Sequence, residues 1–283
     1  MAGLVDIDAA SYADVFARRS IAVHHHLVDH PLFTMDAIAQ LADRLPSDSV
    51  RRERGDLPLA NSGFGYVEVG QGPPSESIRD VERLGLRITL RDIQHVPEYA
   101  ELINASLDEV DDLVSDREGG MTHRAGYLFI SGPASTTPMH FDVEHSFLLQ
   151  VRGVKRVSVA SFADDPSRRH RELDRYIDGE ECDFETMQAQ ADVTRLEPGI
   201  GVYLPSYVPH WVETEAGVSI SFSIPFFTAY TERAEGVSRI NRRLRQLHLS
   251  PRPLGESAPV DTAKAAVFRS LQKVKDVRHK VPV

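Results

Sequence analysis

The sequence predicts a mainly β fold with flanking helices, and three observations support this prediction. Short segments rich in β-branched and aromatic residues lie between residues 126 and 227, glycine and proline separate several of them, and helical periodicity returns on either side. Strands of this length and spacing favour an antiparallel barrel or a double-sheet jelly roll. The predicted strands are Tyr127–Ile130, Phe147–Val151, Arg156–Ala160, Gly201–Leu204 and Val218–Ile224.

The segment before these strands is expected to be helical with loops. Residues 1–60 are predicted as helices and loops, with a clear helix at 34–45 for which Thr34 is the expected N-cap and Pro46 the stop. Glycine and proline are frequent over Asn61–Ser77, which predicts a loop.

Two further elements are predicted before the β core. A strand is expected within residues 80–91, because the apolar residues Leu86, Ile88 and Leu90 alternate with Arg87 and Thr89. A helix is expected over Pro97–Leu113, because its apolar residues lie along one face. These are Leu102, Ile103, Leu107, Val110 and Leu113.

The C-terminal part returns to a helical pattern. Helices are predicted at Tyr230–Leu249 and Asp261–Val277, with Pro251 and Pro253 between them. Residues 161–192 form a long polar insertion with ten acidic residues. We therefore expect an N-terminal region of helices and strands (1–120), a β core that carries the insertion (121–228) and C-terminal helices (229–283).

Composition limits the classes of protein and of site. The chain has 283 residues, of which 41% are hydrophobic and 26% charged, which excludes a disordered or collagen-like chain and allows one large domain or two smaller ones. A formal net charge of −10 gives no overall attraction to nucleic acid, so we expect no such partner. The single cysteine, Cys182, excludes an internal disulfide and a cysteine-based metal cluster, so a metal would need His, Asp or Glu ligands.

Membrane and export signals are also absent from the sequence pattern. No stretch approaches the ~20 apolar residues of a membrane span, so no membrane partner is expected. The N-terminal residues lack the basic and apolar regions of a secretory signal, which favours a cytoplasmic protein.

The most informative stretch is Thr136–Asp142. His140 and Asp142 are two residues apart, so on an extended segment their side chains point to one face and could meet one metal ion. His210, shortly after a predicted strand, offers a third ligand. Two imidazoles and one carboxylate leave open coordination positions, which suits non-haem Fe(II) and oxygen chemistry. The alternative is a solvated chance pair, because the chain has 12 histidines and 42 acidic residues.

Two neighbouring residues add to this pattern. Lys155 follows a turn at Arg152–Gly153, and Thr137 precedes His140 by three residues. An ammonium and a hydroxyl directed into a barrel could hold a distal carboxylate by charge-assisted hydrogen bonds. A buried lysine would be costly without such an anion, whereas the alternative is an outward-facing strand lysine.

The order and spacing of these residues resemble the JmjC/cupin-like family of Fe(II)- and 2-oxoglutarate-dependent oxygenases. The similarity is greatest to the asparaginyl hydroxylase branch and its bacterial cupin-like relatives, and it covers about a third of the chain. It implies a double-stranded β-helix (jelly-roll/cupin) core with N- and C-terminal α-helices. The matching runs are Thr137–Asp142, Phe147–Arg156, Gly199, Tyr203–Pro205 and Pro209–Trp211.

The resemblance also implies roles for particular residues. By position, His140, Asp142 and His210 match the iron ligands, and Lys155 and Thr137 match the residues that bind the C5 carboxylate of 2-oxoglutarate. The asparaginyl hydroxylase has asparagine at two positions near the cosubstrate where this chain has serine. Ser146 matches the first of these positions, and Ser223 aligns only loosely with the second. Tyr127 could line the pocket, with a half-buried barrel tyrosine as the alternative. The additional cosubstrate residues are thus Ser146, Ser223 and Tyr127.

The implied activity is an oxygenase reaction that uses Fe(II), 2-oxoglutarate and O2. It releases succinate and CO2 and hydroxylates an unactivated C–H of an amino-acid side chain in a protein, a peptide or a carrier-bound substrate. The alternatives are a small-molecule or natural-product hydroxylase of the same chemistry, an N-demethylase, and a non-catalytic cupin-like module that only binds a metabolite.

Several other features carry weaker expectations. Glu144 and His145 are expected near the mouth of the pocket, and the acidic insertion is expected to act as a lid that favours a cationic substrate. The histidine cluster at 24–26, with His30, is interpreted as a helical surface or core patch rather than a metal site.

The C-terminal helices carry two patterns of their own. Their arginine run, Arg239–Arg245 with Arg252, is interpreted as a solvated helix face rather than a nucleic-acid site. In related hydroxylases the C-terminal helices form a dimer interface. An apolar stripe here is compatible with such a homodimer, and it consists of Val237, Ile240, Leu244 and Leu247.

Overall fold

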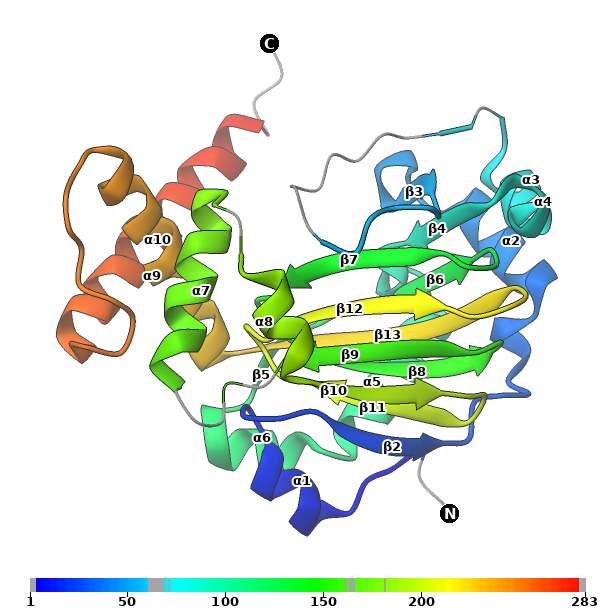
Figure 1. Cartoon of the computed structure of the whole chain (residues 1–283), viewed down its shortest axis with the longest axis horizontal. Helices are drawn as coiled ribbons and strands as arrows, with labels where there is room; N and C mark the ends of the chain where they lie inside the picture. Colours follow the sequence, from blue (N-terminus) through cyan, green and yellow to red (C-terminus); the bar gives the residue numbers. More distant parts are fainter. Residues whose placement is uncertain are drawn as a thin grey trace.

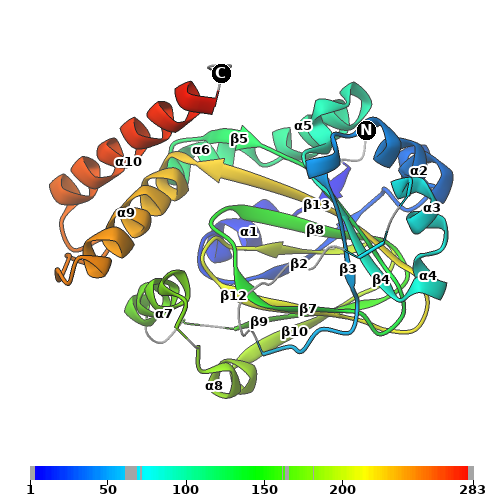
Figure 2. The ribbon, with the colours of Figure 1, turned by 90° about the horizontal axis from the view of Figure 1, so that it is seen from above.

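Two antiparallel sheets that face each other form the centre of the protein (Figures 1 and 2). The computed structural model describes residues 4–60, 69–70, 72–160, 162, 166–180 and 182–279. Within these residues, helices surround the sheets, and the pair α9 and α10 projects from the end of the long strand β13 (Figure 2). The predicted mainly β fold with a jelly-roll core and flanking helices is confirmed.

The larger sheet contains nine of the described strands. Its order is β1 (Val5–Asp6), β2 (Ile21–His25), β11 (Ile200–Leu204), β8 (His145–Arg152), β13 (Ser219–Thr228), β6 (Tyr127–Ser131), β4 (Leu86–Leu90) and β3 (Val50–Arg54), and β5 (Met121–Arg124) pairs with β13 off this path. The four-stranded sheet has the order β10 (Ala191–Leu196), β9 (Lys155–Ala160), β12 (Pro209–Thr214) and β7 (Thr136–Phe141).

The helices fall into three groups along the chain. Before the β core come α1 (Ala9–Val15), α2 (Met35–Arg44), α3 (Pro74–Arg79), α4 (Val81–Leu84), α5 (Pro97–Asp108) and α6 (Asp111–Glu118), with short 3-10 turns at Pro31–Phe33, Ser47–Ser49 and Ile93–His95. The insertion holds α7 (Pro166–Asp178) and α8 (Phe184–Ala189), and the chain ends with α9 (Ala229–Gln246) and α10 (Ala258–His279). None of the described helices combines the length and apolar composition that a membrane span requires.

Most local predictions agree with these elements. The five predicted strands correspond to β6, β8, β9, β11 and β13, and the strand expected within 80–91 is β4. The Thr34 side chain accepts a hydrogen bond from the Ala37 N–H at the start of α2, as an N-cap should. The helix predicted over Pro97–Leu113 is instead divided into α5 and α6. At the division, the Glu109 carboxylate accepts hydrogen bonds from the Leu4 and Val5 N–H groups.

Two of the secondary-structure predictions for residues 1–77 were wrong. Residues 1–60 contain the strands β1, β2 and β3 as well as helices, because β2 pairs with the distant β11, and such partners are not visible in local patterns. The loop prediction for Asn61–Ser77 fails where α3 begins at Pro74, while residues 61–68 and 71 lie outside the described residues.

The histidine cluster at 24–26 lies on strand β2 rather than on a helix. His25 is buried and its Nε2 lies 2.9 Å from the Gln150 carbonyl oxygen, whereas His26 pairs with Asp6 at 2.8 Å. These contacts show that the histidine cluster is a structural part of the larger sheet, near its edge.

The apolar core lies mainly on one face of the larger sheet. Side chains of strand β8 point alternately to the two faces of the sheet. Phe147, Leu149 and Val151 join the large apolar cluster beneath the N-terminal helices, whereas Leu148 faces the space between the sheets. A smaller apolar cluster around Val157 and Val212 fills part of that space, and the rest of it forms a cavity.

Candidate active site

Three metal-ligating side chains converge in the cavity between the sheets. His140 lies near the end of β7 and Asp142 directly after it, while His210 lies on β12. The two strands pair so that His210 is directly opposite His140, which brings together residues 70 positions apart in the sequence. Their ligand atoms all lie within 4.8 Å of one another.

The distances between these atoms suit a shared ion. The Asp142 Oδ2 atom lies 3.8 Å from His140 Nε2 and 3.5 Å from His210 Nε2. Metal–ligand bonds of about 2.1 Å separate neighbouring ligand atoms by about 3 to 3.5 Å, so a small inward movement would complete the site.

The second nitrogen of each imidazole is already engaged. His140 Nδ1 lies 2.8 Å from the Pro138 carbonyl oxygen, and His210 Nδ1 lies 3.1 Å from that of Val208. Because a carbonyl only accepts, both rings carry their proton on Nδ1 and present a bare Nε2 to the cavity. Burial, and next the neighbouring His210, lower the pKa of His140 to about 4, which keeps this ring neutral near pH 7.

The cavity has a volume of about 350 Å³, and its lining includes all eight of the predicted site residues. Lys155 is 4% exposed and its side chain faces inward, with Nζ 5.9 Å from the centroid of the Phe129 ring. Burial, and next the charge of Arg87, lower the pKa of Lys155 to about 7. No carboxylate of the described residues pairs with this lysine, so the outward-facing alternative does not hold.

Thr137 is held by an ion pair that the sequence reasoning missed. Its Oγ1 accepts a hydrogen bond of 2.9 Å from Arg87, and the same guanidinium donates to Glu53 Oε2 at 2.5 Å. Arg87 and Glu53 lie opposite each other on β4 and β3, and both are buried. The alternation of Arg87 and Thr89 with apolar residues was the available signal, because it showed that β4 has a polar face directed away from the apolar core.

The three remaining predicted residues also reach the cavity. The Ser146 and Ser223 hydroxyls lie 2.8 Å apart on the paired strands β8 and β13. Tyr127 is half-buried, with the Arg91 guanidinium 5.7 Å from the centroid of its ring. Both interpretations of Tyr127 therefore apply, because it is a half-buried barrel tyrosine that lines the pocket.

Glu144 and His145 face in opposite directions. Glu144 lines the cavity, where burial and the neighbouring Asp142 raise its pKa to about 8. His145 was wrongly expected at the mouth. It is fully buried behind the cavity wall, stacked on Phe16 at 5.0 Å, because the alternation of β8 sends it to the face opposite Ser146.

Among the described residues of the insertion, Tyr176 is the one that lines the cavity, and its ring lies 5.0 Å from that of Phe141. Two acidic residues of α7, Asp174 and Asp178, pair with Arg245 on α9 rather than facing the cavity. Arg245 therefore departs from the expected solvated arginine face. These ion pairs give no support to selection of a cationic substrate by the insertion.

The site lies within a stretch of the chain that matches a described domain. Residues 101–233 match the JmjC domain. A stretch of 106 residues is 36% identical to the Jumonji C domain-containing protein 5 of Drosophila melanogaster and covers 34% of this chain and 26% of that protein. The match thus spans about a quarter of the length of this relative.

The whole fold is similar to solved structures from Escherichia coli. The X-ray structure of ycfD matches with a TM-score of 0.50 and 15% identity, covering 95% of this chain and 68% of that one. A crystal structure of the E. coli ribosomal oxygenase YcfD matches with a TM-score of 0.49 and 15% identity, over 96% and 68% of the two chains. At this identity the likeness is one of fold.

Proposed function

We propose that this chain, whose residues 101–233 match the JmjC domain, is an Fe(II)- and 2-oxoglutarate-dependent oxygenase of that family. The observation that carries the proposal is the content of one cavity. It combines two imidazoles and a carboxylate within 4.8 Å of one another with a buried lysine that has no carboxylate partner among the described residues.

The ligand set fits iron. His140, Asp142 and His210 would hold Fe(II) on one side and leave positions open for a cosubstrate and oxygen. The backbone carbonyls of Pro138 and Val208 fix the two rings through Nδ1, so only Nε2 faces the ion. When bound, the iron couples the oxidation of 2-oxoglutarate to succinate and CO2 with oxidation of a C–H bond.

The polar wall beyond the ligands fits the distal carboxylate of 2-oxoglutarate. Lys155 supplies the charge and Thr137 a hydroxyl, while Arg87 holds the Thr137 oxygen from behind and Glu53 holds Arg87. An anion bound here would offset the cost of burying the lysine cation. Ser146, Ser223 and Tyr127 provide further polar contacts along the same cavity.

The substrate would enter on the half-buried side of the cavity. The lining residues Arg91, Glu144 and Tyr176 are only partly buried, whereas Leu148, Leu204 and Val212 close the other side and exclude water. A C–H bond of an amino-acid side chain in a protein, peptide or carrier-bound substrate is the proposed target. A small-molecule hydroxylase and an N-demethylase use the same chemistry and are distinguished by their products.

The wild-type protein tests this proposal without a known substrate. Incubated with Fe(II), 2-oxoglutarate and air, it is expected to form succinate slowly, and a chelator should stop the reaction. A search for +16 Da products in cell extract treated with the loaded enzyme then identifies the substrate. Tight binding of 2-oxoglutarate without any succinate would instead favour the non-catalytic metabolite-binding module.

A cytoplasmic homodimer through α9 and α10 is a further part of the proposal. Val237 of the expected stripe is buried within its own protomer, but Leu247 and Leu249 are 69% and 55% exposed, and Val267 and Leu271 of α10 are 51% and 38% exposed. Apolar side chains exposed together often mark an interface. Light scattering at micromolar concentration should give the dimer mass, and a monomer would contradict this part.

A further inference from the structure

The loop between β11 and β12 supports two of the three proposed metal ligands. The Tyr207 N–H donates a hydrogen bond of 2.7 Å to the Asp142 carbonyl oxygen, and the Val208 carbonyl accepts from His210 Nδ1. Tyr207 is fully buried and has φ +59°, a left-handed conformation that is strained for a residue with a side chain. Surrounding contacts must therefore hold the loop in place.

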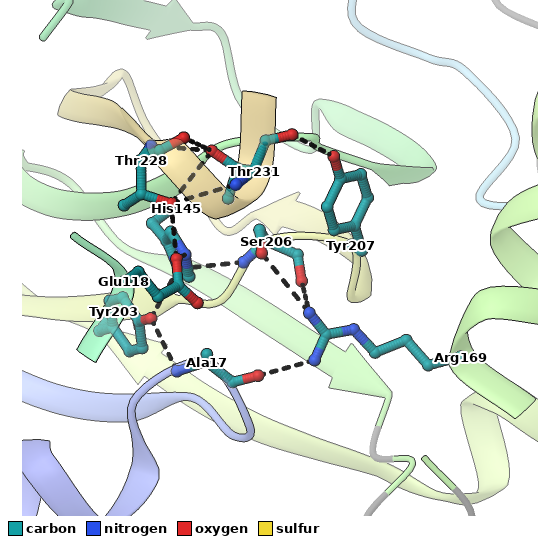
Figure 3. Close-up of polar contacts among 9 residues, drawn as sticks. All are labelled: Ala17, Glu118, His145, Arg169, Tyr203, Ser206, Tyr207, Thr228 and Thr231. Carbon is teal, nitrogen blue, oxygen red and sulfur yellow. Dashed lines mark hydrogen bonds and ion pairs between the residues drawn. The ribbon is translucent and has the colours of Figure 1, made fainter. Parts of the chain in front are cut away.

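The residue before Tyr207 is bound on both of its backbone groups (Figure 3). The Ser206 N–H donates to His145 Nδ1 at 3.3 Å, and the Ser206 carbonyl accepts from the Arg169 guanidinium. Arg169 also donates to the Ala17 carbonyl at 2.7 Å, and the Tyr207 hydroxyl donates to the Thr231 carbonyl at 2.9 Å. The loop is thus held by contacts with His145, Arg169 and Thr231.

His145 acts as an acceptor in this network because of its other partner. Its Nε2 lies 3.1 Å from Glu118 Oε2, so Nε2 carries the proton and Nδ1 accepts, from the Tyr203 hydroxyl at 2.7 Å as well as from the Ser206 N–H. The same Glu118 oxygen accepts from the Thr228 hydroxyl at the start of α9. Burial alone would raise the pKa of Glu118, but the hydrogen bonds from His145 and Thr228 and the charge of Arg169 lower it.

Arg169 reaches this network from the insertion. It lies on α7, and its guanidinium points toward Ser206 of the loop and toward Ala17 (Figure 3). A buried guanidinium is costly unless carbonyls and a counter-charge surround it. The two carbonyl oxygens and the charge of Glu118 supply both, although burial still lowers the pKa of Arg169.

We infer that Arg169 is a positioning residue for the metal site: by holding the Ser206–Val208 loop, it fixes the backbone on which Asp142 and His210 depend. Docking of the insertion helix is thereby linked to metal binding. The same helix places Tyr176 in the cavity, so docking of this helix would also affect the side of the cavity where substrate would enter. This inference rests on the proposed function, because it requires that the three ligands bind a metal.

Three variants test the inference, with Co(II) as the probe. Arg169→Met removes both hydrogen bonds to the carbonyls and is expected to weaken Co(II) binding about 10- to 100-fold, the range found when the supports of metal ligands are removed. Arg169→Lys keeps the charge but can reach one carbonyl at a time, so we expect an intermediate loss. Arg171→Met, at an exposed position on the same helix, is the control and should bind as the wild type does.

Amide hydrogen exchange of the metal-free protein provides a second measurement. In Arg169→Met the Ser206 and Tyr207 amides should exchange faster while those of β8 and β13 keep their protection, whereas general destabilisation would accelerate exchange throughout. If Arg169→Met does not fold, Arg169→Lys decides between the outcomes.

Three outcomes separate this inference from the proposed function. Co(II) affinity and loop exchange within twofold of the wild type, in a folded Arg169 variant, would overturn the inference. Uniformly faster exchange with unchanged Co(II) affinity would also overturn it, since Arg169 would then be merely structural. A wild-type protein that binds no Co(II) would instead contradict the proposed function.

Discussion

Replacing Lys155 with methionine is expected to abolish 2-oxoglutarate turnover and to leave the folded protein as stable as before or more stable. The side chain is 4% exposed and burial lowers its pKa from 10.5 to about 7. Each pKa unit corresponds to about 1.4 kcal/mol, so the charged lysine costs several kcal/mol in the absence of an anion. Methionine fills a similar volume without that cost, but it cannot bind a carboxylate.

The neighbouring residue provides a matched control. Arg156 is exposed on the same strand, where it pairs with Glu213 at 3.1 Å, so Arg156→Met removes a cation of similar size from the outer face. Succinate formation should fall by at least about 100-fold in Lys155→Met, the loss expected when a charged contact worth about 3 kcal/mol is removed, and should hardly change in Arg156→Met. Urea unfolding of the metal-free proteins measures stability. A strongly destabilised Lys155→Met protein would show that the lysine supports the fold instead.

The same lysine predicts how pH acts on stability and on cosubstrate binding. Its folded-state pKa of about 7 lies below the ordinary lysine value of 10.5, so its penalty is fully present below pH 7 and disappears as pH rises from about 7 to 10.5. The advantage of Lys155→Met should therefore be largest below pH 7. A bound carboxylate favours the charged form of Lys155. Binding of 2-oxoglutarate should therefore be accompanied by the uptake of close to one proton at pH 8 and of almost none at pH 6. Calorimetry in two buffers measures this uptake.

The proposed metal ligands could be predicted from the sequence because their geometry is largely local. Alternation along a strand places His140 and Asp142 on one face, whatever the rest of the fold does. His210 is 70 positions away, and it was indicated by its place after a predicted strand and by the family resemblance of the Pro209–Trp211 run. The pairing of β7 with β12 then sets the two histidines opposite each other.

The support of Thr137 could not be predicted because it depends on pairing between strands. Glu53 meets Arg87 only when β3 and β4 align in the observed register, and β3 itself was missed. Alternation on β4 showed that Arg87 and Thr89 share a face, but a local pattern does not say whether that face meets water or a closed cavity. That polar face of β4 lines a closed cavity only because the second sheet covers it.

Arg169 illustrates a different limit. In the sequence it is one arginine in a polar insertion, and a solvated helix surface is the usual environment of such residues. Its burial follows from the docking of α7 beside the loop that precedes His210, which brings together segments from three parts of the chain. No local pattern records that contact.

Replacing His140 with alanine is expected to remove metal binding and, with it, the formation of succinate. The ring supplies one of three protein ligands, and the two that remain cannot hold the ion on one face. We expect Co(II) affinity and succinate formation to fall by at least about 100-fold, more than the loss of a supporting contact produces. His24→Ala is the control, because His24 is exposed on β2 of the larger sheet and is not among the residues that line the cavity.

Thermal unfolding makes the His140 experiment independent of turnover. A ligand that binds only the folded state at 100 times its dissociation constant stabilises it by about 2.7 kcal/mol. Co(II) should therefore raise the unfolding temperature of the wild type and of His24→Ala but not that of His140→Ala. Equal shifts in all three proteins would place the ion elsewhere and contradict the assigned ligands. A shift confined to the proteins with His140, but without succinate from any of them, would separate metal binding from catalysis.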